Sequence, residues 1–201
     1  IAATRRTGTG STTIYCTDQA PTMYATNRTS TRRRTNSARQ LTYIQQANLG
    51  GSGGFSRGMY ETLKAGTSAH TLLLDDDAIS EPESIIRAVQ FADYCNTPTI
   101  VGGGMLHLDN RTVMYAQGER VDMREMRMFP AVGAEYNHDY AQFPLRDCPK
   151  LHRRFNVDFN GWWLCLIPTA CMKQIGLSMP ASSNSMTSNT DCAPRSMDSI
   201  R

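Results

Sequence analysis

Three consecutive aspartates, Asp75, Asp76 and Asp77, follow a run of three leucines in the stretch TLLLDDDAISEPES. Adjacent carboxylates repel one another, so the group suggests either a bound cation or a solvated loop. Mg²⁺ and Mn²⁺ take oxygen ligands, and they commonly bind through one or two carboxylates together with substrate phosphates. Because alternate residues of an extended segment point the same way, Asp75 and Asp77 are the predicted ligands, with Asp76 turned away. The alternative is an acidic loop before a helix, where Asp and Glu are favoured.

A glycine-rich stretch, NLGGSGGFSRG, begins at Asn48, upstream of the aspartates. Glycine lets backbone N–H groups approach an anion, so one interpretation is a cradle for phosphate, to which Arg57 could add positive charge. The stretch has neither the G-K-[ST] of a P-loop nor the G-x-G-x-x-G spacing of a dinucleotide site. The other interpretation is therefore a tight turn between a strand and a helix.

Two adjacent tryptophans, Trp162 and Trp163, lie in the stretch FNGWWLCLIP. Neighbouring residues of a strand point to opposite faces, so both rings cannot easily lie in one core. One interpretation is that one ring lines a pocket, where it could stack on a sugar. The other places one ring in the core and the other under a loop.

Alternating strand and helix patterns surround these motifs. The apolar run that ends at Leu74 has no polar alternation, which is typical of a strand covered on both faces. Ser80 and Glu83 form a predicted capping box at the start of a helix. Further elements are predicted as strands at 11–19 and 97–106 and a helix that ends near Gly66. This order predicts an α/β fold with a mainly parallel central sheet, in which ligands bind at the carboxyl ends of the strands.

Composition narrows the classes of function. The chain has 201 residues, 40% of them hydrophobic, and a formal charge of only +3, which argues against nucleic acid as the main partner. No apolar run approaches the roughly 20 residues that cross a bilayer.

The N-terminus lacks the apolar core of a signal peptide, so we expect a cytoplasmic protein with reduced thiols. The basic stretch at 29–40 is a solvated loop or a contact with an anionic surface, which leaves open a peripheral contact with the cytoplasmic face of the plasma membrane.

Taken in order, several segments resemble the mycobacterial-type galactan galactofuranosyltransferases, which are family 2 glycosyltransferases with a GT-A fold. The segments are NLGGSGGFSRGMYE, LLLDDDAISEPESIIR, VGGGML, GERVD, AEYNHDYAQFPL and LHRRFNVDFNGWW. The resemblance runs from about Gln45 to Pro168. It implies a GT-A (Rossmann-like) nucleotide-sugar-binding core at residues 1–180, poorly matched over 1–44, and an unassigned polar tail at 181–201.

The resemblance implies transfer of galactofuranose, with inversion, from UDP-galactofuranose to a growing, lipid-linked cell-wall galactan. Asp75 and Asp77 correspond to the D-x-D residues that hold Mn²⁺ or Mg²⁺, and Asp75 also approaches the sugar nucleotide. Gln19 and Asn48 correspond to positions that contact UDP-galactofuranose. We also expect the full-length enzyme to be a homo-oligomer.

On the acceptor side, the resemblance assigns Glu119, Trp162 and Trp163 to the region that binds the acceptor sugar. Family members carry an acidic cluster of W-D-D-A type after the Trp–Trp segment, which supplies the catalytic base, and a later His that completes the metal shell. Beyond Pro168 this chain has only Asp191 and Asp198 as carboxylates and no histidine. The base is therefore unassigned, and Asp191 is a candidate by residue type alone.

Two other functions remain open. A family 2 transferase could use another nucleotide sugar, because a D-x-D motif reports the diphosphate and not the sugar. A non-catalytic module could bind a sugar nucleotide or a glycan after losing the base. The absence of a W-D-D-A segment favours the module, whereas the intact DDD and NGWW segments favour the enzyme.

Overall fold

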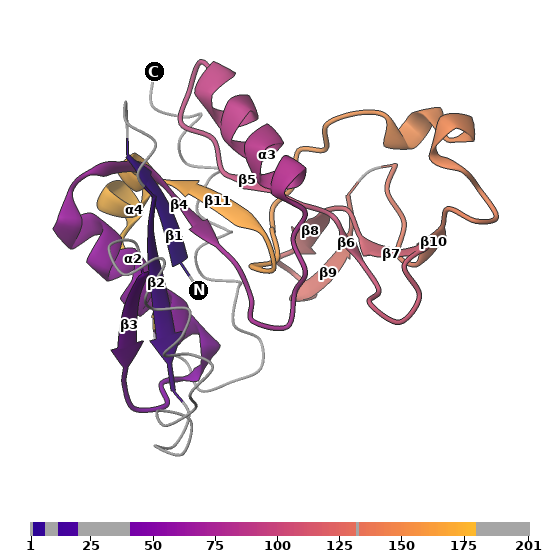
Figure 1. The fold of residues 1–201 in the computed structure, drawn as a ribbon. Coiled ribbons are helices and arrows are strands. Elements are labelled where there is room, and N and C mark those ends of the chain that lie inside the picture. Colours follow the sequence, from indigo (N-terminus) through magenta and orange to yellow (C-terminus); the bar gives the residue numbers. More distant parts are fainter. Residues whose placement is uncertain (1, 7–11, 20–40, 132, 180–201) are drawn as a thin grey trace.

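The computed structural model describes residues 2–6, 12–19, 41–131 and 133–179 (Figure 1). The polar stretch at 181–201, which includes Asp191 and Asp198, and the basic stretch at 29–40 lie outside the described residues. The described chain has a mixed α/β architecture, as predicted, with a six-stranded main sheet and a lobe of two smaller sheets. The main sheet has the order β3-β2-β1-β4-β11-β5 and consists of β1 (Ala2–Arg6), β2 (Thr12–Asp18), β3 (Leu41–Gln45), β4 (Ser68–Leu73), β5 (Val101–Gly102) and β11 (Cys165–Pro168).

The prediction of a mainly parallel sheet is wrong for the pairing of neighbouring strands. Only β2 and β3 pair in parallel, whereas β1 runs against both β2 and β4, and β11 runs against both β4 and β5. It follows that β2, β3, β4 and β5 share one direction, and their carboxyl ends lie at one edge of the sheet. β11 enters between β4 and β5 from far along the chain (Figure 1), and local sequence patterns do not reveal such a long-range insertion.

Three helices accompany the main sheet: α2 (Gly50–Ala65), α3 (Pro82–Tyr94) and α4 (Thr169–Ile175). α2 ends as predicted, because Gly66 adopts the left-handed conformation and its N–H donates to the Thr62 carbonyl oxygen at 3.2 Å. The capping box predicted at Ser80 is wrong. α3 begins one residue later, with Glu81 as N-cap, no capping side-chain bond and Pro82 in the first turn, where its fixed φ suits a helix. None of the helices in the described part combines the length and apolar character needed to cross a membrane.

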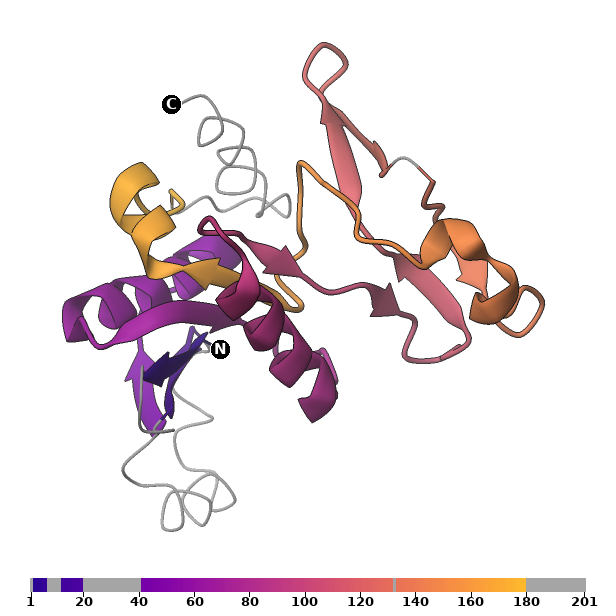
Figure 2. The ribbon, with the colours of Figure 1, turned by 90° about the horizontal axis from the view of Figure 1, so that it is seen from above.

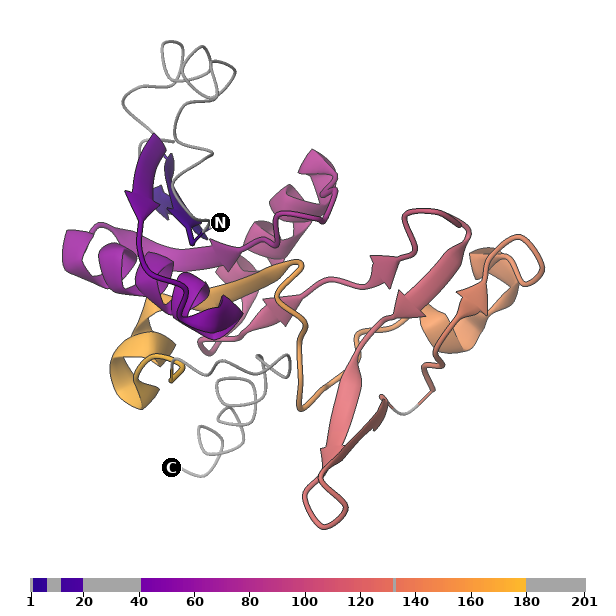
Figure 3. The ribbon, with the colours of Figure 1, turned by 90° about the horizontal axis from the view of Figure 1, so that it is seen from below.

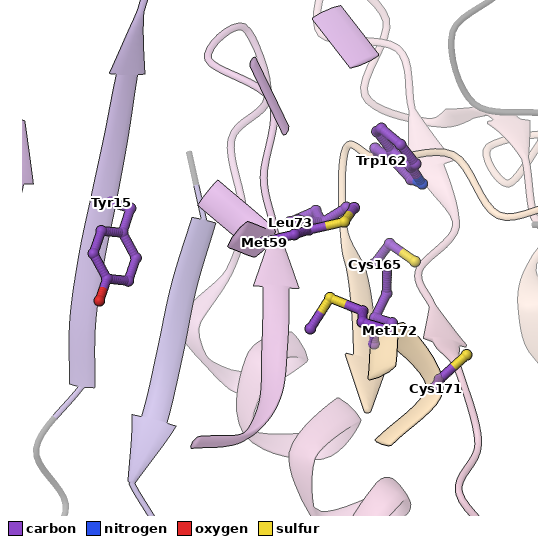
Figure 4. Packing of buried hydrophobic residues seen from close by; sticks show 8 residues of the cluster. Tyr15, Met59, Leu73, Trp162, Cys165, Cys171 and Met172 are labelled. Atoms are coloured by element: carbon purple, nitrogen blue, oxygen red, sulfur yellow. The ribbon is translucent and has the colours of Figure 1, made fainter. Parts of the chain in front are cut away.

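Both faces of the main sheet are covered at β4 and β11, as the unbroken apolar run before Asp75 predicted. On one face, residues of α2 and α4 pack against the sheet in a cluster of Tyr15, Met59, Leu73, Trp162, Cys165, Ile167, Cys171 and Met172 (Figure 4). On the other face, α3 packs in a second cluster of Leu72, Ala88, Ala92, Leu164 and Leu166. Adjacent residues of β4 and β11 therefore enter different clusters, and each buried Leu or Met stabilises the fold by roughly 1.5–3 kcal/mol.

The lobe is formed between β5 and β11, and Figures 2 and 3 show it projecting to one side of the main sheet. Its first sheet consists of β6 (Met105–Leu106), β7 (Val113–Ala116) and β10 (His138–Asp139). Its second sheet is the hairpin of β8 (Glu119–Asp122) and β9 (Arg127–Pro130). Two short 3-10 turns follow, at Leu145–Asp147 and Pro149–Leu151. An isolated bridge between Glu119 and Phe159 joins the hairpin to the segment that returns to β11.

Candidate functional site

Predicted donor-side residues follow three strands whose carboxyl ends share one edge of the main sheet. Gln19 comes directly after β2, and Asn48 comes three residues after β3, which pairs in parallel with β2. Asp75 comes two residues after β4. Ligands of open α/β sheets bind at this kind of edge. The structure thus brings Gln19, Asn48 and Asp75 to one side of the sheet.

Asp75, Asp76 and Asp77 form an exposed cluster of carboxylates at this edge. Each can place one oxygen within 4.8 Å of the others. The expectation that Asp76 turns away is wrong, because β4 ends at Leu73 and the chain turns at residues 76–77 rather than continuing as an extended strand. The alternation of side chains that holds in a strand does not hold in a turn.

No positively charged side chain of the described residues forms an ion pair with this cluster. The pKa of the Asp75 carboxyl is raised, first by partial desolvation and then by the negative charge of Asp77. The Asp76 N–H that donates to Asp75 Oδ1 at 3.2 Å acts in the opposite direction. Three hard oxygen donors without an ion-pair partner in the described part of the chain fit a divalent cation such as Mg²⁺ or Mn²⁺.

Gln19 and Asn48 secure the start of α2. Gln19 Oε1 accepts the Leu49 N–H at 2.8 Å, and Gln19 Nε2 donates to the Gly50 carbonyl oxygen at 2.9 Å. Asn48 Oδ1 accepts the Gly50 N–H at 2.9 Å. The Asn48 amide nitrogen has no protein partner in the described part of the chain, and so it can donate to a ligand at this edge.

The glycine-rich stretch forms the first turns of α2. A Cβ on Gly54 would lie 2.9 Å from Gln19 Nε2, so glycine allows the end of β2 to approach the helix closely. The guanidinium of Arg57 lies 2.9 Å from the Glu61 carboxylate, which already offsets its charge. Most of the stretch is therefore helix rather than the predicted tight turn, and it packs the start of α2 against the end of β2.

The two tryptophans have different surroundings. Trp162 is only 2% exposed and packs edge-on against Phe55 of α2, with ring centroids 5.0 Å apart. Trp163 is half-buried on the other face of the sheet, and its indole N–H donates to the Gly103 carbonyl oxygen at 2.7 Å. Leu73, the last residue of β4, pairs with Cys165, the first residue of β11. Asp75 follows that end of β4 and Trp163 precedes that start of β11, so both residues lie beyond the same end of this strand pair.

A chain of aromatic rings leads from Trp163 into the lobe. The ring centroids of Trp163 and Tyr115 are 6.4 Å apart, and those of Tyr115 and Tyr136 are 6.1 Å apart. The Tyr136 hydroxyl donates to Glu119 Oε1 at 2.6 Å. The structure therefore connects Glu119 with Trp163, which the sequence assigned to one region by resemblance alone. Tyr115 and Tyr136 were missed because they lie far apart along the chain and in no shared motif.

Comparison with known proteins defines the class of this chain. Residues 10–193 match the family described as "Glycosyltransferase like family 2", and the chain belongs to that family. It is 43% identical over 146 residues to galactofuranosyltransferase GlfT2 of Mycolicibacterium smegmatis, and 42% identical over 145 residues to GlfT2 of Mycobacterium tuberculosis. Each match covers 70% of this chain but 23% of the relative, so the chain corresponds to less than a quarter of those proteins. The resemblance inferred from the sequence motifs is confirmed at the level of the family.

Proposed function

We propose that this chain is the nucleotide-sugar-binding core of a metal-dependent, inverting galactofuranosyltransferase. The observation that carries the proposal is the placement of the Asp75–Asp77 cluster at the same sheet edge as Gln19 and Asn48. The similarity to two GlfT2 proteins supports UDP-galactofuranose as the donor and a cell-wall galactan as the acceptor. The acceptor would be lipid-linked, and the complete enzyme would be a homo-oligomer.

On the donor side, Asp75 and Asp77 would hold Mn²⁺ or Mg²⁺, and Asp76 is close enough to share the charge. When bound, the cation would offset the negative charge of the diphosphate leaving group. Asn48 would donate its unpaired amide N–H groups to the nucleotide sugar, and Gln19 would fix the start of α2 beside it. These roles depend on groups that are exposed, or have no partner among the described residues, at this edge.

On the acceptor side, Trp163 would offer a ring face to the sugar, and Glu119 would accept a hydrogen bond from one of its hydroxyls. Trp162 is part of the core, so its contribution would be to support Trp163 and α2 rather than to contact the sugar. In an inverting transfer the acceptor hydroxyl attacks the anomeric carbon on the face opposite UDP and loses its proton to a carboxylate. That carboxylate remains unassigned, because Asp191 lies outside the described residues.

We also propose that residues 1–180 form a GT-A core. Helices on both faces of a sheet in which four strands share one direction support this assignment. The family match over residues 10–193 supports it independently.

Calorimetric titration with UDP tests the metal site. We expect binding in the presence of Mn²⁺ and loss of binding in EDTA, in Asp75→Asn and in Asp77→Asn. Asp76→Asn should weaken binding less, because its backbone N–H rather than its carboxylate braces Asp75. Tight UDP binding by all three variants without metal would reject the proposed site.

A donor screen tests the sugar. The full-length protein that contains this chain should transfer sugar from UDP-galactofuranose to a synthetic digalactofuranoside in the presence of Mn²⁺. Transfer from UDP-galactopyranose or UDP-glucose instead would identify a family 2 transferase with a different donor. UDP binding without transfer from any of the three would identify a binding module.

A further inference from the structure

Glu119 carries a carboxylate that the lobe holds firmly but satisfies only in part. The residue is 7% exposed, and its backbone carbonyl accepts the Asp158 N–H at 2.9 Å. Oε1 accepts the Tyr136 hydroxyl at 2.6 Å, whereas the other carboxylate oxygen has no hydrogen-bond partner among the described residues. Among the described residues, the fully buried side-chain polar atoms without a partner belong to Thr71, Gln117 and Trp162. The second Glu119 oxygen is therefore open to solvent, and it can accept a hydrogen bond from a donor outside the protein.

Tyr136 is suited to act as a permanent donor to this carboxylate. Its pKa is raised, first by burial and then by the hydrogen bond to Glu119, so the phenol keeps its proton at neutral and alkaline pH. Its ring packs at an angle of 36° on Tyr115, which also meets Trp163 edge-on. The orientation of Tyr136 is therefore fixed by packing as well as by its hydrogen bond.

We propose that Tyr136 is a positioning residue for the acceptor: by holding one oxygen of Glu119, it aims the other oxygen at a hydroxyl group of the acceptor sugar. The aromatic chain from Trp163 through Tyr115 supplies ring faces beside this carboxylate, which is the combination that a sugar with polar edges and C–H faces requires. This inference rests on the proposed function for the identity of the sugar. Its alternative is a purely structural link between Tyr136 and β8.

Tyr136→Phe separates these two roles, because it removes the hydroxyl and keeps the ring. In the full-length protein, we expect the acceptor KM for a synthetic digalactofuranoside to rise about tenfold, as for the loss of one bond to a charged group. The KM for UDP-galactofuranose should stay within about twofold. Tyr140→Phe is the matched control, because Tyr140 is also in the lobe and half-buried, and its hydroxyl bonds to Met114 Sδ at 3.1 Å, away from Glu119.

A double-mutant cycle tests whether Tyr136 acts through Glu119. If it does, Tyr136→Phe should add almost nothing to the loss caused by Glu119→Gln, because the positioned oxygen is already altered. Melting temperatures of all variants show whether lost stability, rather than misplacement, explains a change. Direct titration of the digalactofuranoside, followed by NMR saturation transfer, gives an affinity even if the variant does not turn over.

Two results would overturn the inference. One is an unchanged acceptor affinity in Tyr136→Phe, and the other is losses in Tyr136→Phe and Glu119→Gln that simply add. A wild-type protein whose affinity for the digalactofuranoside depends on the Tyr136 hydroxyl, but which transfers no galactofuranose, would reject the proposed function and retain the positioning role. The two failures are therefore distinguishable.

Discussion

The indole N–H of Trp163 donates a 2.7 Å hydrogen bond to the carbonyl oxygen of Gly103. This bond ties the residue two positions before β11 to the residue that follows β5, and so it fixes the ring at the edge of the main sheet. Trp162 has the opposite arrangement, since its ring is in the core and its Nε1 is buried without a partner among the described residues. The two adjacent tryptophans should therefore respond differently to substitution.

Replacing each tryptophan by alanine tests this difference. Trp162→Ala should lower the free energy of unfolding by about 3–5 kcal/mol, because it empties a large core volume between α2 and the sheet. Trp163→Ala should destabilise the fold less, leave UDP affinity nearly unchanged and raise the acceptor KM. Urea unfolding and steady-state kinetics measure the two effects. Similar loss of stability in both variants would place Trp163 in the core as well.

The position of the Trp163 ring also depends on Gly161. A Cβ on Gly161 would overlap the Trp163 ring, so Gly161→Ala should force the ring out of place and weaken acceptor binding. Gly104→Ala is the matched control, because its Cβ would be 3.4 Å from the Ala116 carbonyl oxygen, an ordinary contact. Tryptophan fluorescence should change in the first variant and not in the second. Normal acceptor use by Gly161→Ala would show that the ring position does not matter.

These residues show where the sequence was informative and where it was not. The end of α2, β4 and its covered faces follow from local signals, namely a glycine at position 66 and an apolar run without alternation. The position of Trp163 at the end of the sheet that carries Asp75 depends on β11 entering between β4 and β5, a pairing of segments about 90 residues apart that carries no local signature.

The candidate site also contains residues that could be predicted from the sequence and contacts that could not. The carboxylates of Asp75 and Asp77 were predicted from their type and spacing, although their alternation was wrong because the turn begins directly after β4. The bond between Tyr136 and Glu119 could not be predicted, because it joins a strand to a loop 17 residues later with no repeating pattern. Short-range order was readable in the sequence, and contacts across the lobe were not.

The raised pKa of Asp75 leads to a pH-dependent prediction for the metal-free protein. In the folded state the pKa of the Asp75 carboxyl is higher than its ordinary value of 3.8, so the folded state binds the proton more tightly than the unfolded state does. The free energy of unfolding therefore falls as the pH rises from the ordinary pKa through the raised pKa. Asp75→Asn removes the charge, and with it the desolvation cost and the repulsion from Asp77. The substitution should therefore raise the melting temperature at pH 7 by about 1–3 °C, with a difference that shrinks toward pH 4.

In the presence of Mn²⁺, the wild type should have the higher melting temperature and Asp75→Asn the lower one. The cation stabilises the wild type by mass action and has fewer ligands in Asp75→Asn. Asp109→Asn, a change at an exposed aspartate of the lobe, is the control and should alter neither melting temperature. A lower melting temperature of metal-free Asp75→Asn at pH 7 would show that Asp75 stabilises the fold by another route.

The missing base leads to the last prediction. General-base help is typically worth about 10²–10⁴-fold, and it requires a carboxylate held in the correct geometry. The stretch at 181–201 has only Asp191 and Asp198 as carboxylates and few large apolar residues that could pack around them. We therefore expect the 201-residue chain alone to bind UDP and metal but to transfer galactofuranose at a negligible rate.

A longer protein that contains this chain and a W-D-D-A-type cluster should be active, and Asp191→Asn should leave that activity unchanged. Rapid transfer by the 201-residue chain, abolished by Asp191→Asn, would instead identify Asp191 as the base.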